Sequence, residues 1–239
     1  MITEKKVLGI IGGVGPLATS YFMKKIINMT DAKTDQEHIR MIIYNFPDIP
    51  DRTKYILDKN EQDPLPYLKD LAQRLKNDGA CSIAIPCVTA QYFHERLQET
   101  IDIPVFNGVQ ETADYLKEKD IGCVGILGTD GTVKSDLFGD ALRNYGIRYF
   151  YPSLEDQKKV MSIIYDSVKA GKMLDDKELI KVAKSLIDMG AERIILGCTE
   201  LSVIKEQFEL PDYFIDVLDV MARSCVSSFS LLRKEYETL

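Results

Sequence analysis

The sequence predicts an α/β protein with two pseudo-symmetric domains, each a parallel sheet flanked by helices. Short apolar runs of strand length alternate with longer segments of helical periodicity along the whole chain of 239 residues. Glycines bound several of these runs, as is typical of βα units in parallel sheets. Two sequence motifs also occur twice in the same order. Together these observations indicate a duplicated α/β unit.

The predicted strands are short runs rich in Val, Ile and Leu. They are Val7–Ile11, Ile39–Tyr44, Ser82–Ile85, Ile121–Leu127, Ile194–Leu196 and Tyr213–Ile215. Apolar residues at helical spacing predict helices between them. These are Leu17–Met29, Leu65–Asn77, Ala90–Gln98, Gly108–Lys119, Val133–Asn144, Glu155–Ala170, Lys177–Met189 and Leu218–Lys234. The polar segment 45–64 contains three prolines in twenty residues and is expected to be a loop that lines a site.

The repeat consists of two pairs of motifs. GIIGGVG, which begins at Gly9, corresponds to GILGTDG, which begins at Gly125. GACSIAIPCVT, which begins at Gly79, corresponds to GAERIILGCTE, which begins at Gly190, and both pairs have nearly the same offset. Such an ordered repeat predicts two halves related by a pseudo-twofold axis.

The repeat also predicts the domain boundaries. We expect the first domain to comprise residues 1–105 together with 213–239, and the second domain to comprise residues 106–212. Ligands of open α/β sheets bind outside the carboxyl ends of the strands. The active site is therefore expected in the cleft between the two domains.

Composition excludes several classes of function. The chain has 30 Lys and Arg against 37 Asp and Glu, a formal net charge of −7. Nucleic-acid backbones and anionic membranes require clustered positive charge, so neither is an expected partner. No apolar run approaches the roughly 20 residues that span a bilayer, and the apolar run near the N-terminus is too short for a signal peptide. A cytoplasmic location is expected.

The reactive residue types are few. The chain has five cysteines, an odd number, and no C-x-x-C pair, which argues against a disulfide framework. Its only histidines are His38 and His94, so a zinc site is poorly supplied. We expect neither a metal nor another cofactor. Proton chemistry must then depend on Cys, Asp, Glu, Lys or Tyr.

Two cysteines occupy matched positions in the repeat. Cys87 and Cys198 each follow a predicted buried strand and precede a helix. A cysteine at such a place commonly only packs in the core, but a matched pair argues for function. A nearby helix N-terminus is expected to lower the pKa of each thiol. Two thiols on opposite walls of a cleft suit racemisation, in which one face of a carbon loses a proton and the other gains one. Cys81, Cys123 and Cys225 have no counterpart and are expected to be structural.

Other residues are suited to bind an acidic substrate. The glycine motifs match neither the Rossmann pattern nor a P-loop, so a nucleotide is not expected. Their backbone N–H groups are donors for a carboxylate, and Thr129 and Thr132 add hydroxyls. The guanidinium of Arg52 in the long loop is a natural partner of a carboxylate.

Several motifs resemble those of a known family. IGGVGPLAT, DQEHIR, IPDRT, DPLPYL, IPCVTA and LGCTELS occur here in the order seen in the aspartate/glutamate racemases of the Asp/Glu/hydantoin racemase superfamily. The resemblance extends from Val7 to about Ile204. It implies two pseudo-symmetric α/β domains, frequent dimerisation and activity without PLP, metal or nucleotide.

The resemblance also implies roles for individual residues. Cys87 and Cys198 correspond to the acid/base pair, and Arg52 to the arginine that holds the side-chain carboxylate. Lys169, Val88 and Thr89 match positions that contact the substrate, and Thr199 is expected to do so as well. The family usually has PCNTAH where this chain has PCVTAQ, so Val88 and Gln91 replace polar residues of the site.

These observations predict a cofactor-independent racemase that interconverts the L and D forms of aspartate or glutamate, as a homodimer. Two alternatives remain open at this point. One is a relative with another substrate or chemistry, of the maleate isomerase or hydantoin racemase type. The other is an amino-acid-binding protein that has lost turnover, which the substitution at Val88 favours.

Overall fold

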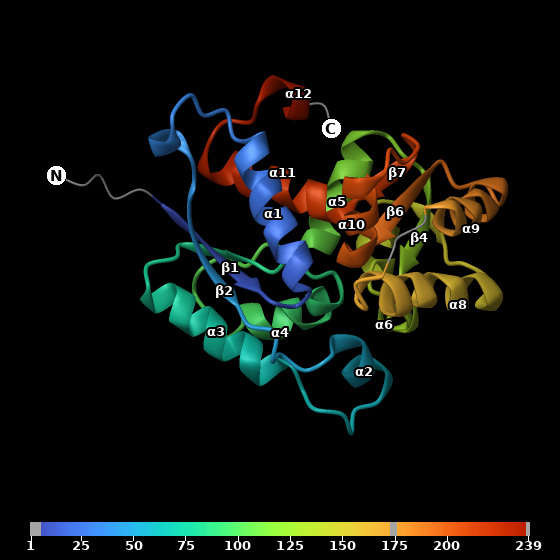
Figure 1. The fold of residues 1–239 in the computed structure, drawn as a ribbon, viewed down its shortest axis with the longest axis horizontal. Coiled ribbons are helices and arrows are strands. Elements are labelled where there is room, and N and C mark those ends of the chain that lie inside the picture. The colour runs from blue at the N-terminus through green and yellow to red at the C-terminus, as the bar shows by residue number, and fades with distance from the viewer. Residues whose placement is uncertain (1–5, 173–175, 238–239) are drawn as a thin grey trace.

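The computed structural model describes residues 6–172 and 176–237. Two parallel sheets, each flanked by helices, form its two halves (Figure 1). The first sheet has the order β2 (Arg40–Asn45), β1 (Val7–Gly12), β3 (Ser82–Ala84). The second has the order β5 (Arg148–Phe150), β4 (Cys123–Gly128), β6 (Arg193–Gly197), β7 (Phe214–Asp216). The predicted fold class is confirmed.

The repeat in the sequence corresponds to a repeat in the strand order. The central strands β1 and β4 carry the two glycine motifs, and each pairs on one side with the strand that precedes a matched cysteine. The opposite neighbours are β2 and β5. The sequence prediction missed β5, which is only three residues long and has an exposed first residue, Arg148.

Helices connect and cover the strands. Their bounds are α1 Pro16–Met29, α2 Arg52–Leu57, α3 Leu65–Asn77, α4 His94–Gln98, α5 Gly108–Glu118, α6 Asp130–Lys134, α7 Gly139–Asn144, α8 Leu154–Ser162, α9 Lys177–Asp188, α10 Thr199–Gln207, α11 Val217–Phe229 and α12 Lys234–Glu237. Asp35–Glu37 and Thr89–Phe93 form 3₁₀-helices, and Ile163–Val168 forms a π-helix after α8. None of the described helices is long and apolar enough to cross a membrane.

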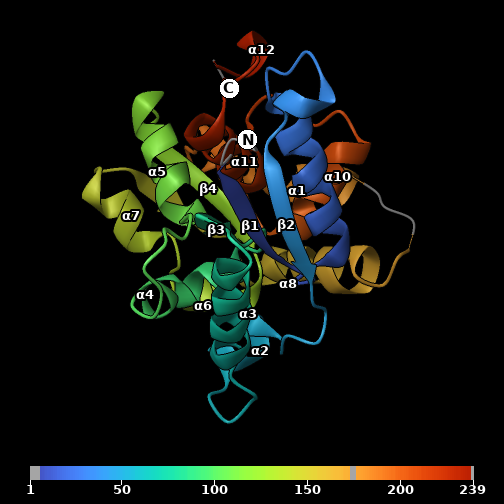
Figure 2. The ribbon, with the colours of Figure 1, turned by 90° about the vertical axis from the view of Figure 1, so that its left-hand side faces the viewer.

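Alternate residues of β1 face different layers. Leu8 and Ile10 pack with Phe22 of α1 and Met221 of α11, while Ile11 packs with Leu71 of α3. Helices α1 and α11 therefore cover one face of the first sheet and α3 covers the other (Figures 1 and 2). The second sheet is covered in the same way, with α5 and α7 on one face and α8 and α9 on the other.

The C-terminal part of the chain contacts both halves. Strand β7 pairs with β6 in the second sheet, and α11 packs against α1 of the first half and α5 of the second. The expected division into residues 1–105 with 213–239 and residues 106–212 stays a prediction.

Several predicted segments differ in detail from the structure, among them Ala90–Gln98, which is a 3₁₀-helix followed by α4, and Leu218–Lys234, which is α11 followed by the start of α12. The segment 45–64, expected to be a loop, contains the short helix α2, which begins at Arg52. The predicted helix Val133–Asn144 is divided into α6 and α7, because Asp136 between them has a left-handed backbone with φ of 49°. The predicted helix Glu155–Ala170 is α8 followed by the π-helix.

The first glycine motif makes a turn that other residues would not fit. Gly13 and Gly15 have φ of 85° and 104°, in the region that favours glycine. A Cβ atom at Gly13 would lie 2.4 Å from the backbone of Phe46. The turn therefore brings the start of α1 close to the chain that leaves β2, at the carboxyl edge of the first sheet.

Candidate active site

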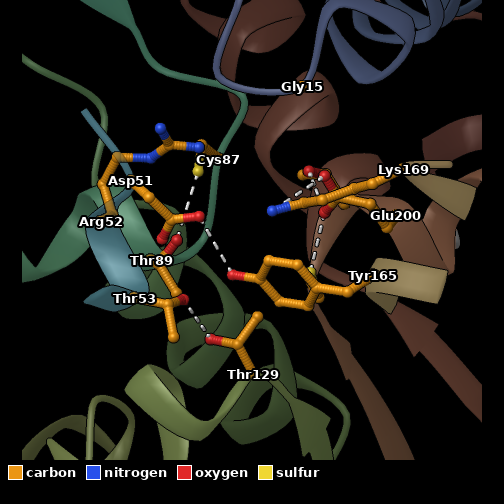
Figure 3. Close-up of polar contacts among 12 residues, drawn as sticks. Gly15, Asp51, Arg52, Thr53, Cys87, Thr89, Thr129, Tyr165, Lys169 and Glu200 are labelled. Atoms are coloured by element: carbon orange, nitrogen blue, oxygen red, sulfur yellow. Dashed lines mark hydrogen bonds and ion pairs between the residues drawn. The ribbon is translucent and has the colours of Figure 1, made fainter. Parts of the chain in front are cut away.

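The carboxyl ends of both sheets lie beside one cavity of about 520 Å³. Its walls come from both halves of the molecule, and Figure 3 shows several of its polar residues. The first half contributes the glycine turn and the start of α2, and the second contributes the end of the π-helix and the start of α10. Charged residues lining it are Asp51, Arg52, Lys169 and Glu200.

Cys87 lies just after β3, next to Arg52 of the first wall. Its side chain is buried, and its Sγ atom lies 3.4 Å from Oγ1 of Thr89. The helix that follows is a 3₁₀-helix of five residues rather than an α-helix. The guanidinium of Arg52 lies beside the sulfur (Figure 3).

Arg52 begins α2, and its backbone position is held by the residue before it. Asp51 caps the helix by accepting a hydrogen bond from the backbone N–H of Lys54 over 3.1 Å. The Arg52 guanidinium donates from Nη1 to the carbonyl oxygens of Ile49 and Pro50, at 3.2 and 3.0 Å. Its Nε atom is buried and has no hydrogen-bond partner among the described residues. Arg52 is thus anchored by backbone carbonyls, with donor capacity left for a carboxylate.

Burial and neighbouring charges act on Arg52 in opposite directions. Burial alone would lower the pKa of the guanidinium, but Cys87 and Asp51 stabilise its charged form and raise its pKa above the usual value. Arg52 is therefore a permanent, desolvated cation beside Cys87.

Cys198 lies between β6 and α10, next to Glu200 of the second wall. It is buried, and its Sγ atom donates a hydrogen bond to Oε2 of Glu200 over 2.9 Å. Burial, followed by the charge of Glu200, raises the pKa of Cys198 well above its usual value, and Lys169 opposes this only in part. The expectation that the helix N-terminus lowers the pKa of this thiol is wrong, because desolvation and an adjacent carboxylate outweigh the helix dipole.

Three further polar residues of the site, Glu200, Tyr165 and Asp51, were not predicted from the sequence. Glu200 lies between Cys198 and Lys169, whose Nζ atom is 3.9 Å from Oε1 of Glu200. The same ammonium group lies 4.0 Å from the centre of the Tyr165 ring, a cation–π contact. The Tyr165 hydroxyl donates to Oδ2 of Asp51 over 3.3 Å, which links the two walls (Figure 3).

One of the missed residues was detectable from the repeat. Glu200 occupies the position that corresponds to Thr89 in the other motif, two residues after the matched cysteine. Glutamates of helices are mostly exposed to solvent, whereas Glu200 is buried. Tyr165 carries no comparable pattern, because its role depends on the π-helix.

The predicted threonines lie close together at the other end of the cleft. Thr129 caps α6 and contacts Thr132, with 3.4 Å between their Oγ1 atoms. Thr53 donates a hydrogen bond to Thr129 over 3.0 Å. Thr129 and Thr132 are buried. Their predicted role as substrate donors stays a prediction.

The residues after the two cysteines are packed tightly. Val88 is 3% exposed and packs with Val109 and Val217 in an apolar cluster. Cys87, Val88 and Thr199 line a common small cavity of about 10 Å³, so residues from the two halves meet there. Gln91 donates to the carbonyl oxygen of Ile85 over 3.2 Å, which explains its burial.

Several predicted site residues are brought to one region from both halves, whereas Cys198, Thr89, Thr129 and Thr132 line neither of the two cavities. Arg52 and Lys169 line the large cavity, while Cys87, Val88 and Thr199 line the small one. Within the described ranges, no group of three or more His, Cys, Asp or Glu side chains is placed to hold a metal ion. The arrangement offers two sulfur atoms for proton transfer and two cations for carboxylates.

The chain is similar in sequence to known racemases. A family model described as Asp/Glu/Hydantoin racemase matches residues 11–225. Among curated proteins, the broad specificity amino-acid racemase RacX of Bacillus subtilis (strain 168) is 27% identical over 228 residues, which cover 93% of this chain and 97% of RacX.

Solved structures show the same fold. The aspartate racemase of Picrophilus torridus superposes with a TM-score of 0.83 at 32% identity, covering 98% of both chains. PH1733, an aspartate racemase homologue from Pyrococcus horikoshii OT3, has a TM-score of 0.75 at 25% identity, covering 93% of this chain and 98% of its own.

Proposed function

Because the chain belongs to the Asp/Glu/hydantoin racemase family and is an amino-acid racemase, an isomerase, we propose that it interconverts L and D forms of aspartate or glutamate. Cys87 and Cys198 are the acid/base pair, and no cofactor takes part. The observation that carries the proposal is the placement of two buried cysteines at matched positions of the two halves, beside a cavity lined by Arg52 and Lys169.

The reaction needs two groups that act on opposite faces of the α-carbon. A thiolate removes the α-proton, so a C–H bond breaks and an S–H bond forms. The thiol on the other wall gives its proton to the opposite face, which leaves the product and a thiolate. The two cysteines exchange these roles when the other enantiomer reacts.

The intermediate state carries extra negative charge on the substrate carboxylate, next to the reacting carbon. Preorganised donors in a site shielded from water stabilise such charge strongly. The backbone N–H groups of the glycine turn, with Thr89 and Thr199, are the proposed donors. Thr129 and Thr132 are assigned to the substrate as well, at the end of the cleft that Thr53 closes.

The choice of an acidic substrate depends on charge. Aspartate and glutamate each carry two carboxylates, and the cavity has two cations, Arg52 and Lys169, beside the carboxylates of Asp51 and Glu200. Arg52 is the proposed partner of the side-chain carboxylate, because its buried Nε donor is unpartnered among the described residues. An apolar Val88 favours a second candidate, a broader substrate range, which RacX has by its name. The predicted homodimer also stays part of the proposal.

Chiral chromatography tests the function directly. The protein is incubated separately with the pure L and D forms of aspartate, glutamate, alanine and serine, and both enantiomers are measured over time. We expect approach to an equal mixture from either side for aspartate or glutamate. Conversion of only alanine or serine would contradict the acidic substrate. Stabilisation of the fold by an amino acid without any conversion would identify a binding protein instead.

A further inference from the structure

Each cysteine has a hydrogen-bonding neighbour two residues later, and the two neighbours differ. Thr89 follows Cys87 and Glu200 follows Cys198, at corresponding positions of the repeated motif. The Oγ1 atom of Thr89 lies 3.4 Å from the sulfur of Cys87, and Oε2 of Glu200 lies 2.9 Å from the sulfur of Cys198. The two neighbours therefore occupy corresponding positions of the repeat but differ in chemistry.

The two neighbours favour different states of the sulfur. A threonine hydroxyl has both a proton to donate and lone pairs to accept, so it stabilises a thiolate or a thiol. An ionised glutamate only accepts, so it forms a hydrogen bond with a thiol and repels a thiolate. The neighbouring charges differ as well, because the Arg52 cation lies beside Cys87 and the Glu200 carboxylate lies beside Cys198.

Other charged groups lie on the elements that pack around Cys198. Lys169, at the end of the π-helix, favours the thiolate, and the Tyr165 hydroxyl on that helix opposes it when ionised. Arg52 and Asp51 face Glu200 and Lys169 from α2. The remaining charged residues on α1, β7 and α11 interact with residues further along α10. These pairs are Lys25 with Glu206, Asp216 with Ser202 and Asp219 with Lys205. Glu200 is the only one of these groups that hydrogen-bonds the sulfur in the described part of the chain.

We propose that Glu200 is a positioning residue that keeps the proton on Cys198, so that the substrate-free enzyme rests with Cys87 as the base and Cys198 as the acid. The inference rests on the two-cysteine reaction proposed above. It deepens that reaction by assigning the resting state of each sulfur.

The proton balance gives Glu200 and Lys169 linked roles. When the Cys87 thiolate takes the α-proton, Cys198 releases its own proton to the opposite face of the carbon. The Cys198 thiolate then lies beside the Glu200 carboxylate, and Lys169, 3.9 Å from that carboxylate, offsets the doubled negative charge. The enzyme returns to its resting state when Cys198 takes a proton from water and Cys87 gives its proton to water.

Alkylation tests the resting state without any substrate. The full-length protein is treated with iodoacetamide over a range of pH, and the rate at each cysteine is followed by mass spectrometry of its peptides. Thiolates react and thiols do not. In the native protein we expect Cys87 to react at lower pH than Cys198. A lower midpoint for Cys198 than for Cys87 would overturn the proposal.

The variant Glu200→Gln separates the role of the charge from that of packing. The amide keeps the shape but does not repel a thiolate. We expect the midpoint of Cys198 alkylation to fall by at least about one pH unit, which corresponds to an about tenfold faster reaction at a pH below both midpoints. The reaction of Cys81, outside the site, is the internal reference, and Glu178→Gln on the exposed face of α9 is the matched control. An unchanged midpoint for Cys198 in Glu200→Gln would overturn the proposal.

The outcomes also separate this inference from the proposed function. Alkylation needs no turnover, so the predicted shift can occur in a protein that racemises nothing, which would contradict the function alone. Racemisation together with an unshifted midpoint would contradict only the role of Glu200. The alkylation midpoints of Cys87 and Cys198 are compared in the native protein without any variant. The proposal can therefore be tested even if Glu200→Gln does not fold.

Discussion

The hydroxyl of Thr53, on α2 of the first half, donates a hydrogen bond to Oγ1 of Thr129, the capping residue of α6 in the second half, over 3.0 Å. This contact ties the two walls of the cleft together one residue away from Arg52 (Figure 3). The contact therefore helps to fix the position of the Arg52 guanidinium relative to the end of β4 in the second half.

The variant Thr53→Val tests the importance of this contact. Valine has a similar shape but no hydroxyl, so one buried hydrogen bond is lost and Thr129 loses a donor. We expect a loss of about 0.5–1.5 kcal/mol in stability, which lowers Tm by a few degrees, and a several-fold lower kcat/KM for the acidic substrate. Thr53→Ser keeps the hydroxyl and is the control. A Thr53→Val protein with the Tm and kcat/KM of the wild type would show that the contact contributes nothing.

The sheets were predictable because their strands are buried and carry repeated motifs. Runs such as Val7–Ile11 contain too many consecutive apolar residues for a solvent-exposed element. Strand β5 was not predictable, because three residues with an exposed arginine give no clear periodicity. Helix α2 was missed for a related reason, since two prolines and several polar residues precede it and its six residues are few for a helical pattern.

The residues of the site were predictable where a repeat or motif marked them. Cys87 and Cys198 were found from matched positions, whereas the raised pKa of Cys198 was not, because it depends on how deeply Glu200 is buried beside the sulfur. The contact between Tyr165 and Asp51 also depends on packing between residues far apart in the sequence. Such tertiary contacts leave no periodic pattern in the chain.

Replacement of either cysteine by serine tests the acid/base pair. A serine hydroxyl is a far weaker acid than a thiol, so neither proton removal nor proton delivery is expected to proceed at a useful rate. Cys87→Ser and Cys198→Ser should each reduce racemisation by at least about a hundredfold, since general acid–base groups contribute about 10²–10⁴-fold. Circular dichroism serves to verify that the fold is kept. Near-normal racemisation by either variant would rule out the two-cysteine mechanism.

The variant Arg52→Ala tests the assignment of the side-chain carboxylate. Loss of a charge-assisted hydrogen bond costs about 1.5–3 kcal/mol, so kcat/KM for aspartate or glutamate should fall about 10- to 100-fold. Arg52→Lys keeps the charge without the planar fork and should recover part of the loss. Any activity on alanine or serine should change much less. An equal loss for all amino acids would contradict the assignment.

The burial of Val88 predicts the effect of Val88→Asn on stability. The side chain is buried in an apolar cluster with Val109 and Val217, where an amide would lose its hydrogen bonds with water. A buried unsatisfied polar group costs about 1–3 kcal/mol, so thermal unfolding should begin several degrees lower. Val88→Ala, which leaves a small apolar cavity, is the comparison. If Val88→Asn is as stable as the wild type, its amide has found partners in the cleft.

The central claim is that two different sulfur atoms act on opposite faces of the α-carbon. The most direct measurement follows pure L-aspartate and L-glutamate in D₂O by NMR and mass spectrometry at early times, before much product has reverted. With two acid/base groups, the newly formed D enantiomer carries deuterium at the α-carbon, because its proton comes from the second thiol, which exchanges with solvent. The remaining L substrate should stay unlabelled. Equal deuterium in the recovered L substrate and the D product, or no exchange at all, would contradict the account.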